Sequence, residues 1–117
     1  MPFRDWTFRL TDILDAISAV QKYTITMRFD DFVADRKTVD AVIRNLIIIG
    51  EAACHIPDEI CQANPEVPWQ DMRAMRNFVV HEYFGVSDNV LWETIQVDLP
   101  PLVPFIRALL ERHLKDR

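Results

Sequence analysis

Four polar side chains that could take part in catalysis lie close together in an otherwise apolar stretch: Arg76, Asn77, His81 and Tyr83. Arginine supplies a fixed cation whose planar fork matches a phosphate, and histidine gains and loses protons near neutral pH. The amide of asparagine can orient either group. RNA carries its own nucleophile, the 2′-hydroxyl, so its cleavage needs only a proton-transfer group and a cation beside the phosphate. These residue types would therefore suffice for a metal-independent transesterification of RNA.

One helix, predicted to run from Pro68 to Gly85, must position these side chains. Pro68 suits the first turn of a helix, and Gly85 can supply the left-handed residue that ends it. At about 100° per residue, Arg76 and Tyr83 lie about 20° apart, whereas Arg76 and His81 lie about 140° apart. Two side chains so far apart on one helix do not easily share a phosphate. We therefore expect a homodimer in which two such helices meet across a two-fold axis and two Arg and two His converge on one cleft.

Each of these residues also has an ordinary structural interpretation. Arg76 can form a salt bridge, for which Glu51 or Glu82 would serve as partner. A single histidine in an apolar setting, such as His81, is often a satisfied helix residue, and Tyr83 can simply pack at the helix end. The spacing alone leaves both interpretations open.

The run RNFVVHEY, residues 76–83, resembles the Arg-Asn-x-x-x-His-x-Tyr motif of the HepT-like ribonuclease toxins in the HEPN superfamily. Flanking segments resemble the same family, at residues 45–53, 56–60, 68–72 and 85–102. The motif in order with these flanks is a specific signal, unlike Arg-x-x-x-x-His alone. The resemblance implies a metal-independent endoribonuclease without a cofactor, with Arg76 and His81 as its central pair, Asn77 beside them, and the same dimeric arrangement.

The resemblance also implies a partner. Toxins of this type act in a toxin–antitoxin system with an MntA-type minimal nucleotidyltransferase, and the tyrosine of the motif accepts a nucleotide from that antitoxin. Tyr83 would therefore be the site of AMPylation, which would bring a phosphate near Arg76 and silence the enzyme. A second function class stays open: a non-catalytic dimeric interaction module that binds a nucleotidyltransferase partner.

The length and composition of the chain limit these interpretations. The chain has 117 residues, half of them hydrophobic, which predicts a single domain spanning residues 1–117 with a real core. No apolar run approaches a membrane span, and no secretory signal is evident, so we expect a cytoplasmic protein. The net charge of −5 argues against general electrostatic binding of long nucleic acid and suits a basic protein partner. RNA contacts should therefore be local, around Arg73 and Arg76.

Two cysteines, Cys54 and Cys61, are too few for a disulfide framework. Together with His55 they do not give the paired spacing of a zinc site. The sequence therefore predicts buried thiols and no metal.

Apolar residues recur at three- and four-residue intervals along most of the chain, as in the stripe of Trp6, Leu10, Ile13, Ile17 and Val20, and only residues 24–35 lose this period. The pattern predicts an all-α fold, an antiparallel helical bundle of four or five helices. The expected segments are residues 5–23, 37–55, 57–64, 68–85, 88–96 and 100–113, with a short helical turn around Phe29 and Phe32. The segment 37–55 is apolar nearly all round and should be central. Gly50 in its middle costs about 1 kcal/mol relative to alanine, so we expect another helix to pack closely there.

Overall fold

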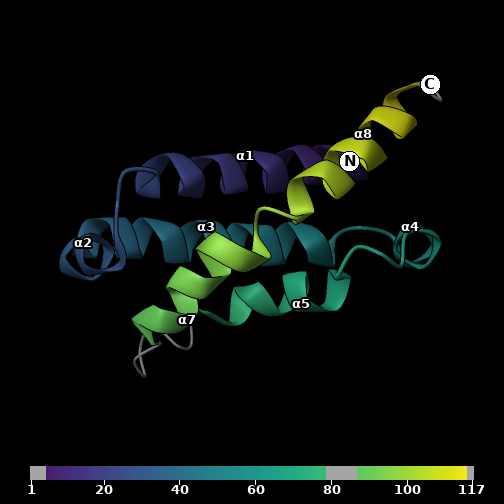
Figure 1. Ribbon diagram of the computed structural model, residues 1–117. Helices are drawn as coiled ribbons and strands as arrows, with labels where there is room; N and C mark the ends of the chain where they lie inside the picture. Colours follow the sequence, from purple (N-terminus) through teal and green to yellow (C-terminus); the bar gives the residue numbers. More distant parts are fainter. Residues whose placement is uncertain (1–4, 79–86, 116–117) are drawn as a thin grey trace.

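The computed structural model describes residues 5–78 and 87–115. Within these ranges the chain forms seven α-helices, one 3₁₀ turn and one π-helical turn, and it contains no strand (Figure 1). The all-α prediction is confirmed, and the long helices pack as the expected bundle. None of the helices in these two ranges is long and apolar enough to cross a membrane.

The first helix, α1 (Trp6–Thr24), begins where the Asp5 carboxylate accepts a hydrogen bond from the backbone N–H of Thr7 at 3.0 Å. Its predicted apolar stripe is buried, with Leu10, Ile13, Ile17 and Val20 fully inaccessible to solvent. Side chains three and four residues apart share one helix face, so this stripe forms a continuous contact surface. That surface packs against α3 and α8.

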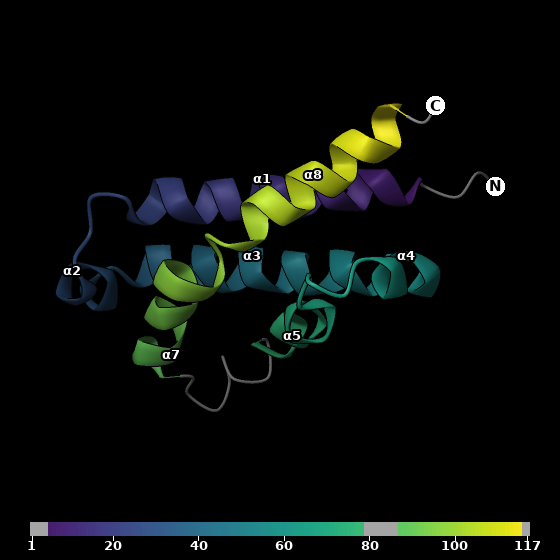
Figure 2. The same ribbon diagram turned by 45° about the vertical axis from the view of Figure 1, so that its right-hand side comes forward.

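Helix α3 (Arg36–Cys54) is central, as its sequence predicts. It packs against α1 on one side and against α5 (Trp69–Ala74) on the other, and Figures 1 and 2 show α1 and α5 on opposite sides of it. The chain reverses direction between α1 and α3 through the short helix α2 (Phe29–Ala34), which is the helical turn expected there. Helix α3 therefore supports α5, at whose carboxyl end Arg76 and Asn77 lie.

Helix α2 is anchored by Phe32, which is fully buried. Its ring centroid lies 5.3 Å from that of Trp92 in α7 (Asp88–Glu93). Aromatic pairs at this distance contribute beyond the area that they bury. The contact joins two segments that are about sixty residues apart in sequence.

The connection from α3 to α5 contains the short helix α4 (Asp58–Ala63) and is held by Asn64. The backbone carbonyl of Asn64 accepts a hydrogen bond from the Trp69 indole at 3.0 Å, and its side-chain oxygen accepts one from Arg112 at 2.7 Å. Asn64 is buried, so these bonds satisfy polar atoms that water does not reach. They fix where α5 begins.

The last elements differ in detail from the predicted boundaries. Helix α7 continues as a π-helical turn, η2 (Thr94–Asp98), before α8 (Leu102–Lys115). Pro100 and Pro101 were expected inside the first turns of α8, but they lie in the turn that precedes it, and only Pro104 lies within the helix. The Leu102 N–H donates to the Leu99 carbonyl at 3.0 Å, so the turn is closed by residues that retain an N–H.

Candidate active site

Arg76 and Asn77 lie at the carboxyl end of the α5 segment, in a short 3₁₀ turn, η1 (Met75–Asn77). The sequence predicted a regular α-helix here, and this detail was wrong: the Phe78 N–H donates to the Met75 carbonyl, three residues back. A 3₁₀ turn has 3.0 residues per turn, so side chains after α5 are rotated relative to an ideal α-helix. Phe78 is again α-helical, so the described part of the segment is helical throughout.

His81, Tyr83 and Gly85 lie in residues 79–86, outside the described residues. Of the predicted site residues, the structure therefore places Arg76 and Asn77. The roles of His81 and Tyr83 stay predictions.

The backbone of Arg76 lies directly against Gly50 of α3. A Cβ atom added to Gly50 would collide with the backbone nitrogen of Arg76, and it would lie 3.0 Å from the Arg76 Cβ and 3.1 Å from the Arg73 carbonyl oxygen. The close helix packing expected at Gly50 is thereby confirmed, and its partner is the motif segment itself. The missing side chain at position 50 lets η1 approach α3 at backbone distance.

The Arg76 side chain forms an ion pair with Glu51, the residue that follows Gly50. The distance from Nη1 of Arg76 to Oε2 of Glu51 is 3.7 Å, and Oε1 of the same carboxylate lies 3.2 Å from Nε2 of His55. The two side chains of the ion pair are 52% and 55% exposed, so water screens the pair and its net stabilisation is small. The guanidinium is thus oriented at the surface rather than buried.

Arg73, expected to join Arg76 in contacting nucleic acid, is engaged in the fold, and its contact with RNA stays a prediction. Its Nη2 donates to the Cys61 sulfur at 3.1 Å, and its Nε donates to the Ala53 carbonyl at 3.5 Å. The side chain is half-buried, and it holds α5 against the end of α3. Among the described residues of this segment, Arg76 is therefore the cation presented to solvent.

The two cysteines are half-buried rather than fully buried. Burial raises the pKa of the Cys61 thiol, and the Arg73 cation opposes this effect without cancelling it. A raised pKa keeps the thiol protonated and unreactive at neutral pH. In residues 5–78 and 87–115 no group of three or more His, Cys, Asp or Glu side chains is arranged to hold a metal ion. The expectation that the enzyme needs no metal stays a prediction.

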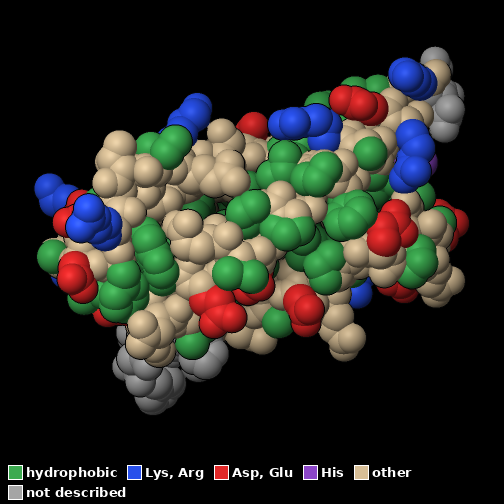
Figure 3. Space-filling model, in the orientation of Figure 1, with side chains coloured by type: hydrophobic (Ala, Val, Ile, Leu, Met, Phe, Trp, Pro, Cys, Tyr) green, Lys and Arg blue, Asp and Glu red, His purple; other side chains and the backbone are tan. Residues whose placement is uncertain are grey.

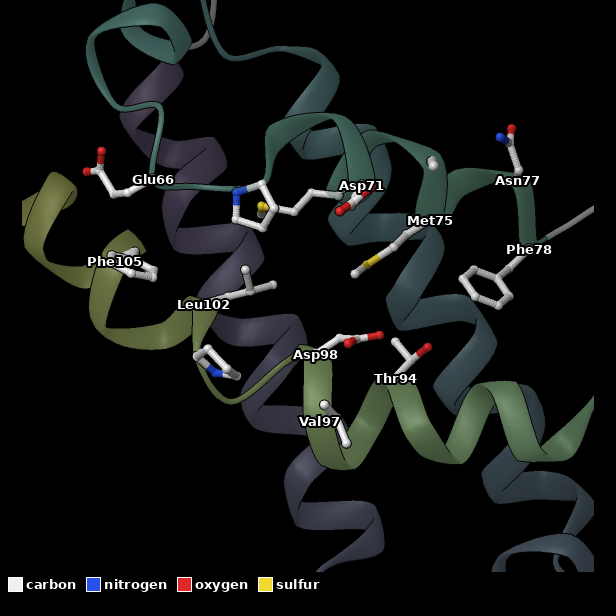
Figure 4. A pocket seen from close by; sticks show the side chains of 14 residues that line it. Glu66, Asp71, Met75, Asn77, Phe78, Thr94, Val97, Asp98, Leu102 and Phe105 are labelled. Carbon is white, nitrogen blue, oxygen red and sulfur yellow. The ribbon is translucent and has the colours of Figure 1, made fainter.

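Asn77 lies at one end of a groove of about 620 Å³ between α5–η1 and the η2–α8 segment, and its amide points away from the groove in Figure 4. Figure 4 shows Met75 and Leu102 extending into this groove from facing sides, with Phe78 at the end where Asn77 stands and Phe105 at the other end. Both Met75 and Leu102 are largely buried and form part of the groove floor. Of the two neighbouring motif residues, Arg76 thus contacts α3, and Asn77 lies at the groove.

Three carboxylates around the groove, Glu66, Asp71 and Asp98, were not recognised as a group from the sequence. They come from the α4–α5 connection, the first turn of α5 and the end of η2. Such distances along the chain leave no local pattern.

The chain belongs to the HepT-like ribonuclease family, whose model matches residues 13–109. Endoribonuclease is therefore its class of enzyme, and the predicted family is confirmed. A Thermococcus cleftensis protein named "Probable ribonuclease HepT" is 46% identical over 93 residues, 80% of this chain and 84% of that protein. A Methanocaldococcus jannaschii protein, named as a candidate RNase, is 34% identical over 111 residues, 95% of this chain and 92% of that protein. No solved structure matches the chain significantly.

Proposed function

We propose that this protein is the metal-independent endoribonuclease toxin of a toxin–antitoxin system. The observation that carries the proposal is the presentation of Arg76: η1 holds its backbone against Gly50 while leaving its guanidinium half-exposed beside Glu51. A pre-positioned cation at the surface is what a reacting phosphate requires. Family membership supplies the substrate class, RNA.

In the proposed reaction the 2′-hydroxyl oxygen of RNA attacks the adjacent phosphorus, and the bond from phosphorus to the 5′-oxygen breaks. His81 accepts the proton of the 2′-hydroxyl and, once protonated, donates a proton to the departing 5′-oxygen. Arg76 neutralises the charge that grows on the phosphate oxygens, and Asn77 orients the reacting groups. The products are a 2′,3′-cyclic phosphate and a 5′-hydroxyl, so no external co-reactant is needed.

The reaction is tested with purified protein and a labelled RNA in excess chelator. The proposal predicts cleavage at an undiminished rate and a cyclic phosphate at the new 3′ end. Complete loss of cleavage on chelation, restored by a divalent metal, would refute the metal-independent mechanism.

The active form is proposed to be a homodimer in which the motif segments of two copies face one another. A regular α-helix would place Arg76 and His81 about 140° apart. The 3₁₀ turn at Arg76 changes this angle, so the proposal rests on the separation of the two residues in sequence together with the family resemblance: a composite cleft would bring an Arg76 and a His81 to one phosphate. Dimerisation also gathers cations within an acidic protein. Light scattering at assay concentrations checks this, since an active monomer is incompatible with a shared site.

The control of the toxin is proposed to act at Tyr83, through an MntA-type nucleotidyltransferase that transfers AMP from ATP to the phenolic oxygen and releases pyrophosphate. The added phosphate would compete with RNA for Arg76. With partner and ATP, wild type should gain one AMP mass on the Tyr83 peptide and lose activity, whereas Tyr83→Phe should stay active. No added mass with a partner shown to be active on another substrate would rule this control out.

A further inference from the structure

The groove beside Asn77 combines two features that rarely occur together on a solvated surface. Its floor is apolar, and two of its apolar side chains remain open to water: Val97 is 58% exposed and Phe105 is 40% exposed. Its rim carries the carboxylates of Glu66, Asp71 and Asp98. We call this site the acidic groove.

All charged side chains that line the acidic groove, among the described residues, are negative. Three carboxylates line it, and none of the described residues that line it is a lysine, arginine or histidine. In Figure 3, Asp and Glu side chains gather over the lower middle of the face, near α5 and η2, whereas most Lys and Arg side chains lie on α8 and near α2. Three carboxylates would repel the phosphates of RNA, so this surface is unsuited to the substrate.

We propose that the acidic groove binds a basic amphipathic segment of a partner protein. Apolar side chains of that segment would cover Val97 and Phe105 and fill the space over the floor, and its Lys or Arg side chains would meet the three carboxylates. A second copy of this chain fits less well, because each copy carries a net charge of −5. A small cation would satisfy the carboxylates but leave the exposed apolar side chains in water.

The acidic groove lies next to Arg76, so a bound partner segment would lie close to the proposed catalytic cation. Asn77 and Phe78 form one end of it, directly after Arg76 in the chain. A partner segment seated there would contact the same 3₁₀ turn that presents Arg76. The acidic groove is therefore a site from which a bound protein influences catalysis, and binding itself does not depend on RNA cleavage.

The proposal is tested with a fluorescein-labelled 16-residue helical peptide that carries leucine on one face and lysine on the other, measured by fluorescence anisotropy with the full-length protein. The Asp71→Asn, Asp98→Asn double variant should bind about tenfold more weakly than wild type, because two rim charge pairs are lost. The matched control is the Asp30→Asn, Asp40→Asn double variant, which removes two exposed carboxylates outside the groove and should bind as wild type does.

A second pair of changes tests the apolar part. Phe105→Ser should weaken peptide binding at both low and high salt, whereas the effect of the aspartate variants should shrink at high salt because screening weakens charge pairs. A peptide with glutamate in place of lysine should not bind. Equal weakening by the control variant, equal binding of the glutamate peptide, or full displacement by spermidine would overturn the proposal. So would peptide binding that merely dissociates a homodimer, because the groove would then belong to the second copy.

Discussion

The backbone of Arg76 packs directly against Gly50: a Cβ on Gly50 would collide with the backbone nitrogen of Arg76. The glycine of the central helix and the arginine of the motif are thus one packing unit. This unit sets how far η1 stands from α3, and hence where the Arg76 guanidinium emerges beside Glu51.

Gly50→Ala is the sharpest test of this contact, because two effects predict opposite signs. Helix propensity alone predicts stabilisation by about 1 kcal/mol. The collision with η1 predicts destabilisation by about 1–3 kcal/mol, since the nearest atom is a backbone nitrogen, which cannot rotate away. We expect the second effect to dominate in chemical unfolding, with cleavage activity reduced as well. Arg44→Ala, on an exposed position of the same helix, is the control and should change little. A stabilised, fully active Gly50→Ala protein would show that the contact is not tight.

Glu51→Gln tests what the ion pair does to Arg76. Because the pair is about half-exposed, we expect a loss of stability below about 1 kcal/mol. Removing the competing carboxylate frees the guanidinium for phosphate, so the KM for RNA should fall about two- to fivefold at low salt. Glu59→Gln on α4 makes the same change in net charge without this contact and should leave KM unchanged. A fall in kcat with unchanged KM would instead assign Glu51 a role in holding Arg76 for catalysis.

Asp35 makes the stability of α3 depend on pH. Hydrogen bonds from the Thr38 hydroxyl and backbone N–H hold the pKa of Asp35 below its ordinary value of 3.8. The folded state therefore favours the charged form, so this stabilisation is complete above the unfolded pKa and disappears as pH falls through the lower folded pKa. Asp35→Ala should lower the denaturation midpoint at pH 7, and its deficit should shrink below about pH 4. Asp40→Ala, at an exposed position in the same helix, should show no such convergence.

Much of the fold was accessible from the sequence because its signals are local. The stripe of Leu10, Ile13 and Ile17 identified α1, and the nearly uniform apolar character of 37–55 identified the central helix. The glycine at position 50 also predicted a close contact with another helix. The sequence did not predict which segment packs against Gly50, because the spacing of apolar residues within one helix does not show which other backbone will approach it.

The candidate site was predicted less completely. Family motifs identified Arg76 and Asn77 as candidates, but these residues lie in a 3₁₀ turn whose backbone is close to Gly50 of α3, and the motif does not encode this tertiary contact. Arg73 was assigned to nucleic acid on charge alone, whereas the Cys61 sulfur and the Ala53 carbonyl, brought together by tertiary folding, bind it. Motif spacing thus selected the candidate residues, whose catalytic roles stay predictions, and long-range contacts decided the surroundings of those that the structure describes.

Complementation between two inactive variants tests directly whether two copies build one active site. Arg76→Ala and His81→Ala should each lower the cleavage rate about 100-fold or more, because one removes the phosphate cation and the other the proton-transfer group. Arg107→Ala, an exposed arginine on α8, should cleave normally. In a mixed dimer of the two variants, the shared cleft retains one Arg76 and one His81. With mixed dimers verified by native mass spectrometry, a composite active site predicts cleavage far above that of either variant alone. No recovery in verified mixed dimers would contradict a composite active site built from Arg76 and His81 of two copies.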